Sequence, residues 1–318
     1  MAKLRALARQ RESLTNVRLS RSRTITFGAM ADDFCLNCVQ SAVIRRVGPD
    51  LLKASLLSIA ALAALSLPAT AEGCGELRDG PRGRVTEVTD GDTVHLDNGL
   101  IVRLVGTQAP KLALGRPGFE DWPLGHEAKS ALAELALGKP VLLRYGGEER
   151  DRYGRVLAQM FVRDGEQEIW AQGAMVASGL ARVYSYADNR ACLASLLAAE
   201  ARARAERLGI WRDPYYSILM AERPEMLTGR QGQYELVEGR VLVAGKASGR
   251  VYLNFGRNWK DDFTAVIGER ALPLFAESGL DPLALGGAFI RVRGWVDDKD
   301  GPRIEVTHPE QIEVLATQ

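Results

Sequence analysis

The sequence predicts a mainly β protein with a few helices (an α+β chain), arranged as two small closed barrels. Three observations lead to this prediction. At 318 residues the chain is long enough for two domains of ordinary size. Segments that alternate apolar and polar residues recur in each half, and one amphipathic helix interrupts each group. The composition, 46% hydrophobic and 25% charged, is that of a globular protein.

The first group of strands lies between residues 83 and 162. Its first three segments are rich in Val, Ile and Thr and are separated by turns at Asp90-Gly91 and Asp97-Asn98-Gly99, a pattern typical of antiparallel strands. A helix over 125–137 precedes two more strands. Five strands with one intervening helix suit a barrel of the oligonucleotide-binding type. The expected strands are 83–89, 93–97, 100–106, 140–145 and 155–162.

Two helices are expected after this barrel. The first covers 169–178 and ends at Gly179. The second runs from Asp188, as its N-cap, to Leu208. Its inner face is expected to consist of Cys192, Leu193, Leu196, Leu197, Ala201 and Ala205.

A second strand-rich unit follows a linker with two prolines and a polar run. The order of three strands, one helix and two strands again matches a barrel of the oligonucleotide/oligosaccharide-binding type. The expected strands are 235–244, 250–254, 263–267, 288–297 and 303–306, with a helix over 271–279. The predicted parts of the chain are therefore an N-terminal extension with a signal peptide (1–71), a first domain (72–212), a linker (213–233) and a C-terminal domain (234–318).

The segment 45–71 is typical of a secretory signal peptide. Arg45, Arg46 and Lys53 provide its positive side, an apolar run follows, and Ala69-Thr70-Ala71 is a small-x-small cleavage site. The apolar run is shorter than the about 20 residues that a membrane span needs. We therefore expect cleavage after Ala71, a secreted or periplasmic protein without a transmembrane span, and a true start downstream of Met1.

Charge and cysteine content fit this expectation. The whole chain has a formal net charge of +1, but 10 of its 41 basic and 4 of its 40 acidic residues precede residue 72, which leaves −5 for the remainder. Any polyanion must therefore be bound through a local basic cluster. After Ala71 only Cys74 and Cys192 remain, and in an oxidising compartment we expect them to form a disulfide; the alternative is two unrelated thiols.

Three short segments carry chemistry. They are Val88-Thr89-Asp90-Gly91-Asp92-Thr93, Val102-Arg103-Leu104-Val105-Gly106 and Asp151-Arg152-Tyr153-Gly154-Arg155. In this order, over about residues 82–211, they resemble the staphylococcal nuclease (thermonuclease) family. The resemblance implies a nuclease-type barrel that acts on DNA or RNA with calcium. It implies a calcium-binding carboxylate at Asp92 with Asp90 beside it, phosphate-binding guanidinium groups at Arg103 and Arg155, and nucleotide contacts at Tyr153 and Arg152.

The site departs from the family pattern at two positions. Where the family has Asp-x-Pro-Glu, this chain has Gln108-Ala109-Pro110-Lys111, so one metal carboxylate and the expected general base are both missing. The two changes add three positive charges to the site. An ammonium group at Lys111 repels a divalent cation but attracts phosphate. We therefore expect calcium binding to be weak or lost, Lys111 to join the catalytic arginines as a fixed cation, and hydrolysis to be weak or absent.

Two other functions fit the same residues. One is an active nuclease with altered metal use, in which Glu120, Asp121 or Glu127 replaces the missing base. The other is a cell-envelope binding module whose two barrels bind a protein or a glycan.

The C-terminal unit offers a candidate site for a second ligand. Aromatic residues alternate there with basic ones, as in proteins that stack bases and contact phosphates. The alternative is that several of these aromatic rings form the barrel core, which we favour for Phe263. The residues are Tyr252, Phe255, Trp259 and Phe263 with Arg250, Arg257 and Lys260.

Overall fold

The computed structural model describes residues 74, 76–258 and 260–316. The expected signal peptide at 45–71 lies outside the described residues, as does Trp259. None of the helices in the described part is long and apolar enough to span a membrane.

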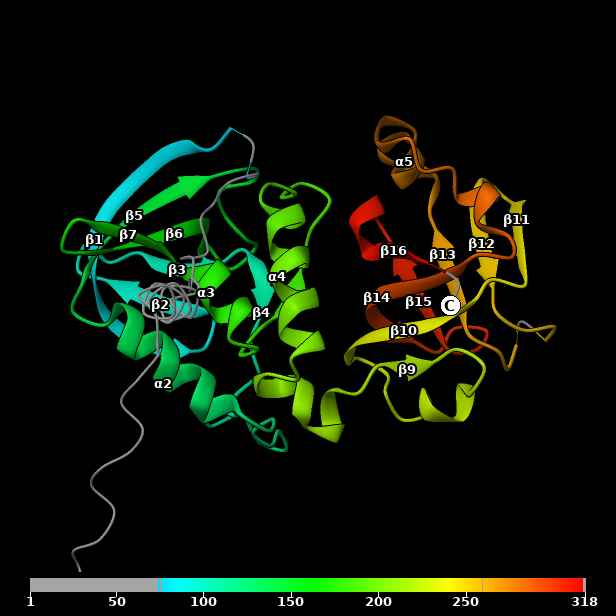
Figure 1. Cartoon of the computed structure of the whole chain (residues 1–318), viewed down its shortest axis with the longest axis horizontal. Helices are drawn as coiled ribbons and strands as arrows, with labels where there is room; N and C mark the ends of the chain where they lie inside the picture. The colour runs from blue at the N-terminus through cyan, green and yellow to red at the C-terminus, as the bar shows by residue number, and fades with distance from the viewer. Residues whose placement is uncertain (1–73, 75, 259, 317–318) are drawn as a thin grey trace, which may run out of the picture. The chain divides into compact units, whose positions relative to one another are not determined.

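The first domain is a closed five-stranded barrel (Figure 1). Its strands follow the order β3-β2-β1-β5-β6, and a parallel pairing of β3 with β6 closes the ring. Short β7 extends the sheet beyond β6, and β4 pairs separately with β8. The bounds are β1 Arg78–Asp90, β2 Thr93–Leu96, β3 Ile101–Leu104, β4 Gly106–Gln108, β5 Pro140–Tyr145, β6 Val156–Asp164, β7 Gln167–Trp170 and β8 Arg182–Tyr184.

Within the described residues, three helices cover this barrel. Helix α2 (Gly125–Ala136) packs against β1 and buries Ala128, Leu132 and Ala136, as its apolar spacing predicts. Helices α3 (Ala171–Ala177) and α4 (Leu193–Ala205) pack against each other. The expected helix over 169–178 is thus shorter, because its first residues form β7.

The prediction for the helix after Asp188 was right in burying Cys192, Leu193 and Leu196, but wrong in the start of the helix and in the second half of its face. Cys192 has a left-handed backbone (φ 65°), which a helix interior excludes, so α4 begins one residue later. The buried face contains Ala199, Glu200 and Ala203, whereas Ala201 is exposed. Local apolar spacing does not predict a buried glutamate, because the partner of Glu200 comes from the other domain.

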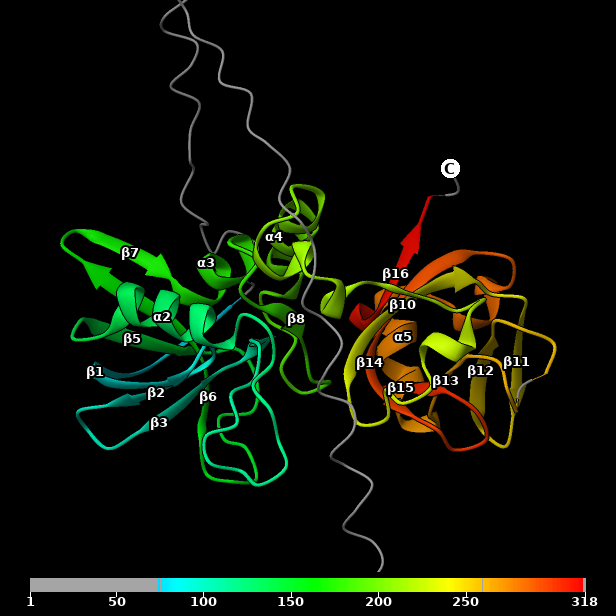
Figure 2. The same ribbon diagram turned by 90° about the horizontal axis from the view of Figure 1, so that it is seen from below.

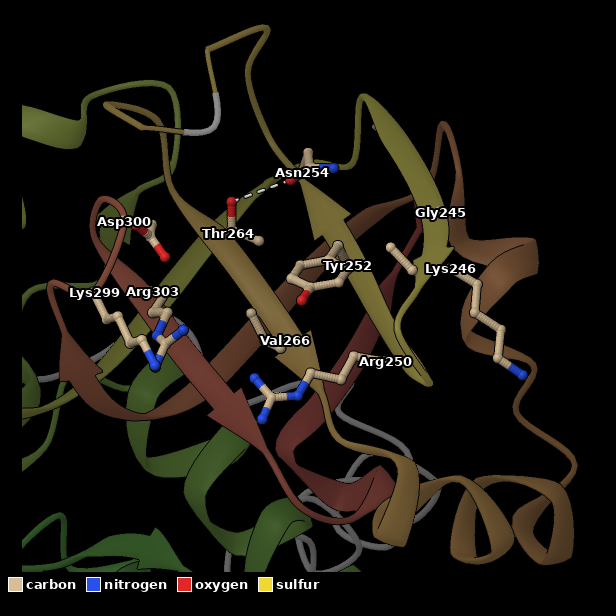
Figure 3. Close-up of a pocket in the computed structure, with 11 residues that line it drawn as sticks. Gly245, Lys246, Arg250, Tyr252, Asn254, Thr264, Val266, Lys299, Asp300 and Arg303 are labelled. Atoms are coloured by element: carbon tan, nitrogen blue, oxygen red, sulfur yellow. Dashed lines mark hydrogen bonds between the residues drawn. The ribbon is translucent and has the colours of Figure 1, made fainter.

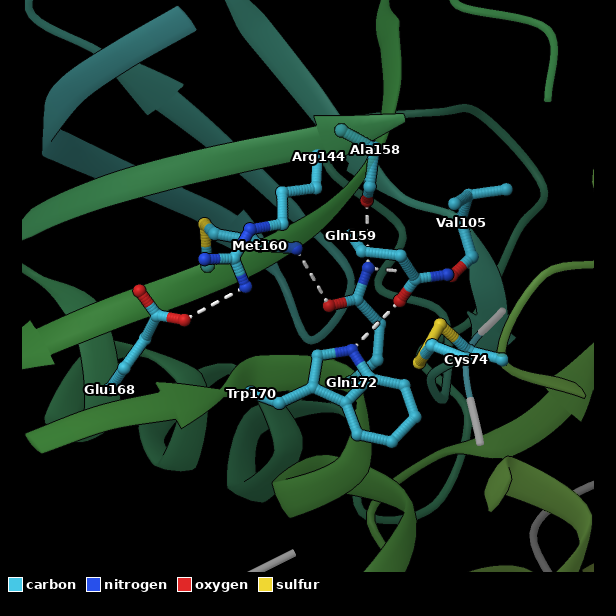
Figure 4. Close-up of a disulfide and its surroundings, with 10 residues drawn as sticks. Cys74, Val105, Arg144, Ala158, Gln159, Met160, Glu168, Trp170 and Gln172 are labelled. Atoms are coloured by element: carbon cyan, nitrogen blue, oxygen red, sulfur yellow. Dashed lines mark hydrogen bonds and ion pairs between the residues drawn. A yellow bond between two sulfur atoms is a disulfide. The ribbon is translucent and has the colours of Figure 1, made fainter. Parts of the chain in front are cut away.

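A disulfide and a buried amide network lie close together in the first domain (Figure 4). Cys74 is bonded to Cys192, 118 residues away in the sequence. Nearby, the Trp170 indole donates to Gln159 (2.8 Å), and Gln172 accepts from the Met160 backbone (3.0 Å) and donates to the carbonyl of Ala158 (2.7 Å). These bonds satisfy buried polar groups and attach β7 and α3 to β6.

The second domain repeats the topology of the first. Its sheet follows the order β11-β12-β13-β15-β14-β10-β9, with β16 paired to β14. The parallel pairing of the third and fifth barrel strands is β3 with β6 in the first domain and β13 with β15 in the second. In both barrels one helix precedes the fourth strand: α2 precedes β5, and α5 precedes β14. The fold class predicted from the sequence is therefore confirmed. The bounds are β9 Leu219–Met220, β10 Tyr234–Arg240, β11 Val243–Ala247, β12 Arg250–Asn254, β13 Thr264–Ile267, α5 Leu272–Ser278, β14 Phe289–Asp297, β15 Arg303–Val306 and β16 Ile312–Leu315.

Three features of the second domain were not expected. The segment 213–233, expected as a linker, contributes β9 and the buried Leu227 to this domain. Strand β16 adds to its sheet. Phe255 belongs to the core, with its ring centroid 5.0 Å from that of Phe263, for which a core position was favoured, so neither ring is available as a stacking surface.

A buried ion pair joins the two domains. Arg293 of β14 and Glu200 of α4 are both inaccessible to solvent, and an Arg293 nitrogen lies 2.8 Å from a Glu200 oxygen. Glu200 also accepts from the backbone of Val183 in β8 at 2.8 Å. The hydroxyl of Tyr234 in β10 donates to the carbonyl of Val183 (3.0 Å). The second domain therefore supports β8, which pairs with β4.

Candidate functional site

The site begins at the turn between β1 and β2. Asp90 ends β1 and accepts a hydrogen bond from the backbone of Asp92 at 3.1 Å. Gly91 lies between them, and a Cβ at this position would come within 2.7 Å of the Cβ atoms of both Ala109 and Ala128. The turn can therefore approach α2 and the segment after β4 only because residue 91 is glycine.

Lys111 and Asp92 form the centre of the site. The Lys111 ammonium lies 3.1 and 2.9 Å from the two carboxylate oxygens of Asp92 and 3.7 Å from Asp90. The Ala109 backbone also donates to Asp92, at 2.8 Å. Burial alone would raise the pKa of Asp92, but the charges of Arg103 and Lys111 lower it well below the usual range. Burial, and the charge of Asp92, raise the pKa of Asp90.

Arg103 directs its guanidinium into the protein. It donates to the carbonyls of Leu104 (2.8 Å) and Thr107 (2.6 Å), to the Gln108 side chain (3.4 Å), and it lies 3.2 Å from Asp92. Only 7% of its side chain is exposed. Gln108, at the position of the missing carboxylate, is thus bound to this arginine.

The loop between β5 and β6 presents the second arginine. Asp151 accepts from the backbones of Tyr153 (2.9 Å) and Arg155 (3.0 Å) and from the Arg155 Nε (2.7 Å), which holds the loop in one conformation. The Arg155 side chain is 34% exposed, about five times more than that of Arg103. Tyr153 is 69% exposed, with Arg152 over its ring at 4.8 Å.

Tyr186 is a site residue that sequence reasoning missed. Its ring contacts that of Tyr184 edge-on at 4.8 Å. Burial and a hydrogen bond with Tyr184 raise its pKa, while the charges of Arg103 and Arg155 act to lower it. The charges of both arginines therefore act on this hydroxyl. The alternation Tyr184-Ser185-Tyr186 after Gly179-Leu180-Ala181 is the sequence signal that could have identified it.

The three candidate replacement acids lie on the loop before α2 and at its start. Asp121 is bound to His126 at 2.9 Å and to the backbone of Ala113. Glu120 and Glu127 are exposed. In the described part of the chain, none of the three has a hydrogen bond or ion pair with Asp92, Lys111 or Arg155.

The donor set does not fit a calcium ion. Calcium takes six to eight oxygen ligands, several of them from carboxylates. Here both oxygens of Asp92 contact an ammonium group, and the Gln108 oxygen faces a guanidinium. Among the described residues there is no group of three or more His, Cys, Asp or Glu side chains arranged to hold a metal.

Comparisons with known proteins agree with this architecture. The model of the family described as "Staphylococcal nuclease homologue" matches residues 101–213. The chain is 34% identical over 142 residues to "Protein ParB" of Escherichia coli, covering 42% of this chain and 74% of that protein. It is 32% identical over 134 residues to an "Uncharacterized endonuclease" of Escherichia coli (41% and 77%). It is 29% identical over 130 residues to the "Thermonuclease" of Staphylococcus intermedius (40% and 74%).

The barrel, its two arginine-bearing segments and these similarities define a nuclease-type protein. The chain belongs to the staphylococcal nuclease homologue family. This confirms the resemblance found in the sequence.

Proposed function

We propose that the chain is an exported protein that binds phosphodiester polymers, DNA or RNA, and hydrolyses them weakly or not at all. The observation that carries this proposal is the contact of the Lys111 ammonium with both oxygens of Asp92. An internal cation contacts the carboxylate that the family pattern assigns to the metal, and an ammonium group paired with a carboxylate cannot act as a base.

Arg155 is the main phosphate ligand in this proposal. Its side chain is partly exposed, and its Nε alone is held by Asp151. Arg103 has most of its donors satisfied inside the protein, so its role is to hold Asp92 and Gln108 in place. Tyr153, Arg152 and Tyr186 surround the same region and offer ring faces and charge to a nucleotide.

A cleavage and binding assay tests this function. Labelled single-stranded DNA and RNA are incubated with the protein in Ca²⁺, Mn²⁺ or EDTA, and binding is measured by fluorescence anisotropy at low salt. We expect binding in EDTA that Arg155→Ala weakens, and little or no cleavage in any metal. Rapid metal-dependent cleavage that is lost in Arg155→Ala would instead establish an active nuclease with altered metal use.

Export is supported by the signal-like segment before Ala71 and by the Cys74–Cys192 disulfide, since such bonds persist in oxidising compartments. N-terminal sequencing of the protein recovered from the periplasm or the medium tests it. We expect the mature chain to begin at Glu72. A cytoplasmic protein with free thiols at both cysteines would contradict export.

A further inference from the structure

The second domain has an open pocket of about 550 Å³ on the outer face of its barrel (Figure 3). The pocket is formed by β11, β12, β13 and β15, which lie next to one another in the sheet (Figure 2). The apolar residues of these strands that alternate with the lining residues, such as Val251 and Leu253, belong to the core on the opposite face. The lining includes Arg250, Tyr252, Asn254, Thr264, Lys299 and Arg303.

In its barrel, this pocket lies at the same place in the topology as the candidate functional site does in the first barrel. In barrels of this type, ligands bind across the second and third strands, between the loop that follows the first strand and the loop that precedes the fifth. In the first barrel these two loops carry Asp92 and the Asp151–Arg155 segment. In the second barrel they are 248–249 and 298–302, at the two ends of the pocket.

The pocket is strongly basic. Four cationic side chains line it, Lys246, Arg250, Lys299 and Arg303, against one acidic side chain, Asp300. Within the described part of the chain, neither Arg250 nor Lys299 forms an ion pair, and Arg303 pairs with Asp297 at 2.8 Å. Figure 3 shows Lys299 and Arg303 side by side at one side of the pocket and Arg250 closer to Tyr252, while Lys246 extends away from them.

Tyr252 has space beside its ring. It lies opposite Gly245 on β11 and Val266 on β13, so its neighbour on one side has no side chain. A Cβ at Gly245 would meet no atom within 4 Å. A planar base can therefore stack on the ring. Asn254 and Thr264, joined by a hydrogen bond of 3.2 Å, provide polar atoms along the same face.

We propose that this face of the second barrel binds single-stranded nucleic acid, with a base stacked on Tyr252 and phosphates held by Arg250, Lys299 and Arg303. A flat ring between separated guanidinium and ammonium groups suits alternating bases and phosphates. The choice of nucleic acid over another polyanion rests on the proposed function of the first domain. The chain then has two binding faces for the same polymer, one on each barrel.

Anisotropy titrations of the purified full chain with 5′-fluorescein-labelled oligothymidylate in EDTA test this inference. We expect Tyr252→Ala and Arg250→Ala each to raise Kd about fivefold or more, and Tyr252→Phe to leave it unchanged. Gly245→Val should also raise Kd, because it fills the space beside the ring without changing charge. Arg250→Ala should reduce the slope of log K against log salt by about 0.7.

Arg270→Ala is the matched control, since it removes an exposed cation of the same domain outside the pocket. Arg155→Ala distinguishes binding by the first barrel from binding by the second. If Tyr252→Ala raises Kd and Arg155→Ala does not, this inference is supported while the proposed function of the first site fails. Crosslinking of 4-thiothymidine to the peptide that contains Tyr252 is the direct expected result. If Arg250→Ala and Arg270→Ala weaken binding equally, or if Tyr252→Ala and Gly245→Val do not weaken it, the pocket acts only as a general basic surface. Either result would overturn the inference.

Discussion

The Lys111 ammonium contacts both carboxylate oxygens of Asp92, and the Arg103 guanidinium lies 3.2 Å from one of them. Asp92 is fully buried, so its charge is compensated almost entirely by these two side chains. Lys111 thus has a structural role as well as the proposed electrostatic one, and the two roles can be separated by substitution.

Lys111→Met should destabilise the protein. It leaves the buried Asp92 with one cationic partner in place of two, and breaking a buried pair costs roughly 3 kcal/mol or more. Because Arg103 remains and Lys111 is 21% exposed, we expect a loss of about 2 kcal/mol in the free energy of unfolding at pH 7. Urea denaturation measures it. Lys129→Met on α2 is the control, and an equal small effect in both variants would mean that the Lys111–Asp92 contact does not stabilise the fold.

Restoring the two carboxylates should restore a cation site. In the double variant Gln108→Asp/Lys111→Glu, four carboxylates converge near the turn, and their repulsion lowers stability without metal. Calcium should then bind and raise stability by about 2.7 kcal/mol when its concentration is 100 times Kd. Calorimetric titration and melting curves with and without EDTA test this. Tight stoichiometric calcium uptake by the unaltered chain would contradict the proposed role of Lys111.

Local sequence patterns predicted much of the fold. The predictions that failed concern features that such local patterns do not determine. Alternation and turn residues predicted most strands of both barrels, and the apolar spacing predicted α2, because these signals lie within a few residues. The start of α4 was wrong because Cys192 has a left-handed backbone, and the second half of its face was wrong because Glu200 is buried and paired with Arg293, 93 residues away. Tyr186 was missed because the charges of Arg103 and Arg155, far from it in the sequence, act on its hydroxyl only in the folded barrel.

The Arg293–Glu200 pair should couple the two domains. Glu200 also accepts bonds from Val183 and Arg204, and Arg293 also pairs with Glu313. Glu200→Gln therefore leaves the buried guanidinium with one anionic partner in place of two. We expect it to cost about 3 kcal/mol, and Arg293→Met a similar amount. The double variant Glu200→Met/Arg293→Met should cost clearly less than the sum, which a double-mutant cycle by denaturation measures. Additive losses would show that the two side chains act independently.

His308 should make stability depend on pH. It is buried between Ser185, whose hydroxyl lies 2.6 Å from Nε2, and Thr307, 2.9 Å from Nδ1. Burial lowers its pKa from 6.5 to about 4; Arg190 and Arg293 act in the same direction, and Glu310 and Asp188 oppose them. Between these two pH values the unfolded chain binds more protons than the folded one, so stability is complete above pH 6.5 and falls as the pH is lowered.

From this difference we expect a loss of about 2 kcal/mol between pH 7.5 and pH 5 that is due to His308. Denaturation at both pH values measures it, and His308→Gln should remove most of the difference while lowering stability at pH 7.5 through lost packing. His126→Gln, at an exposed histidine, should leave the difference unchanged. If His308→Gln kept the full dependence on pH, the effect would belong to other groups, and the contact with Ser185 would not control the stability of this region in acid.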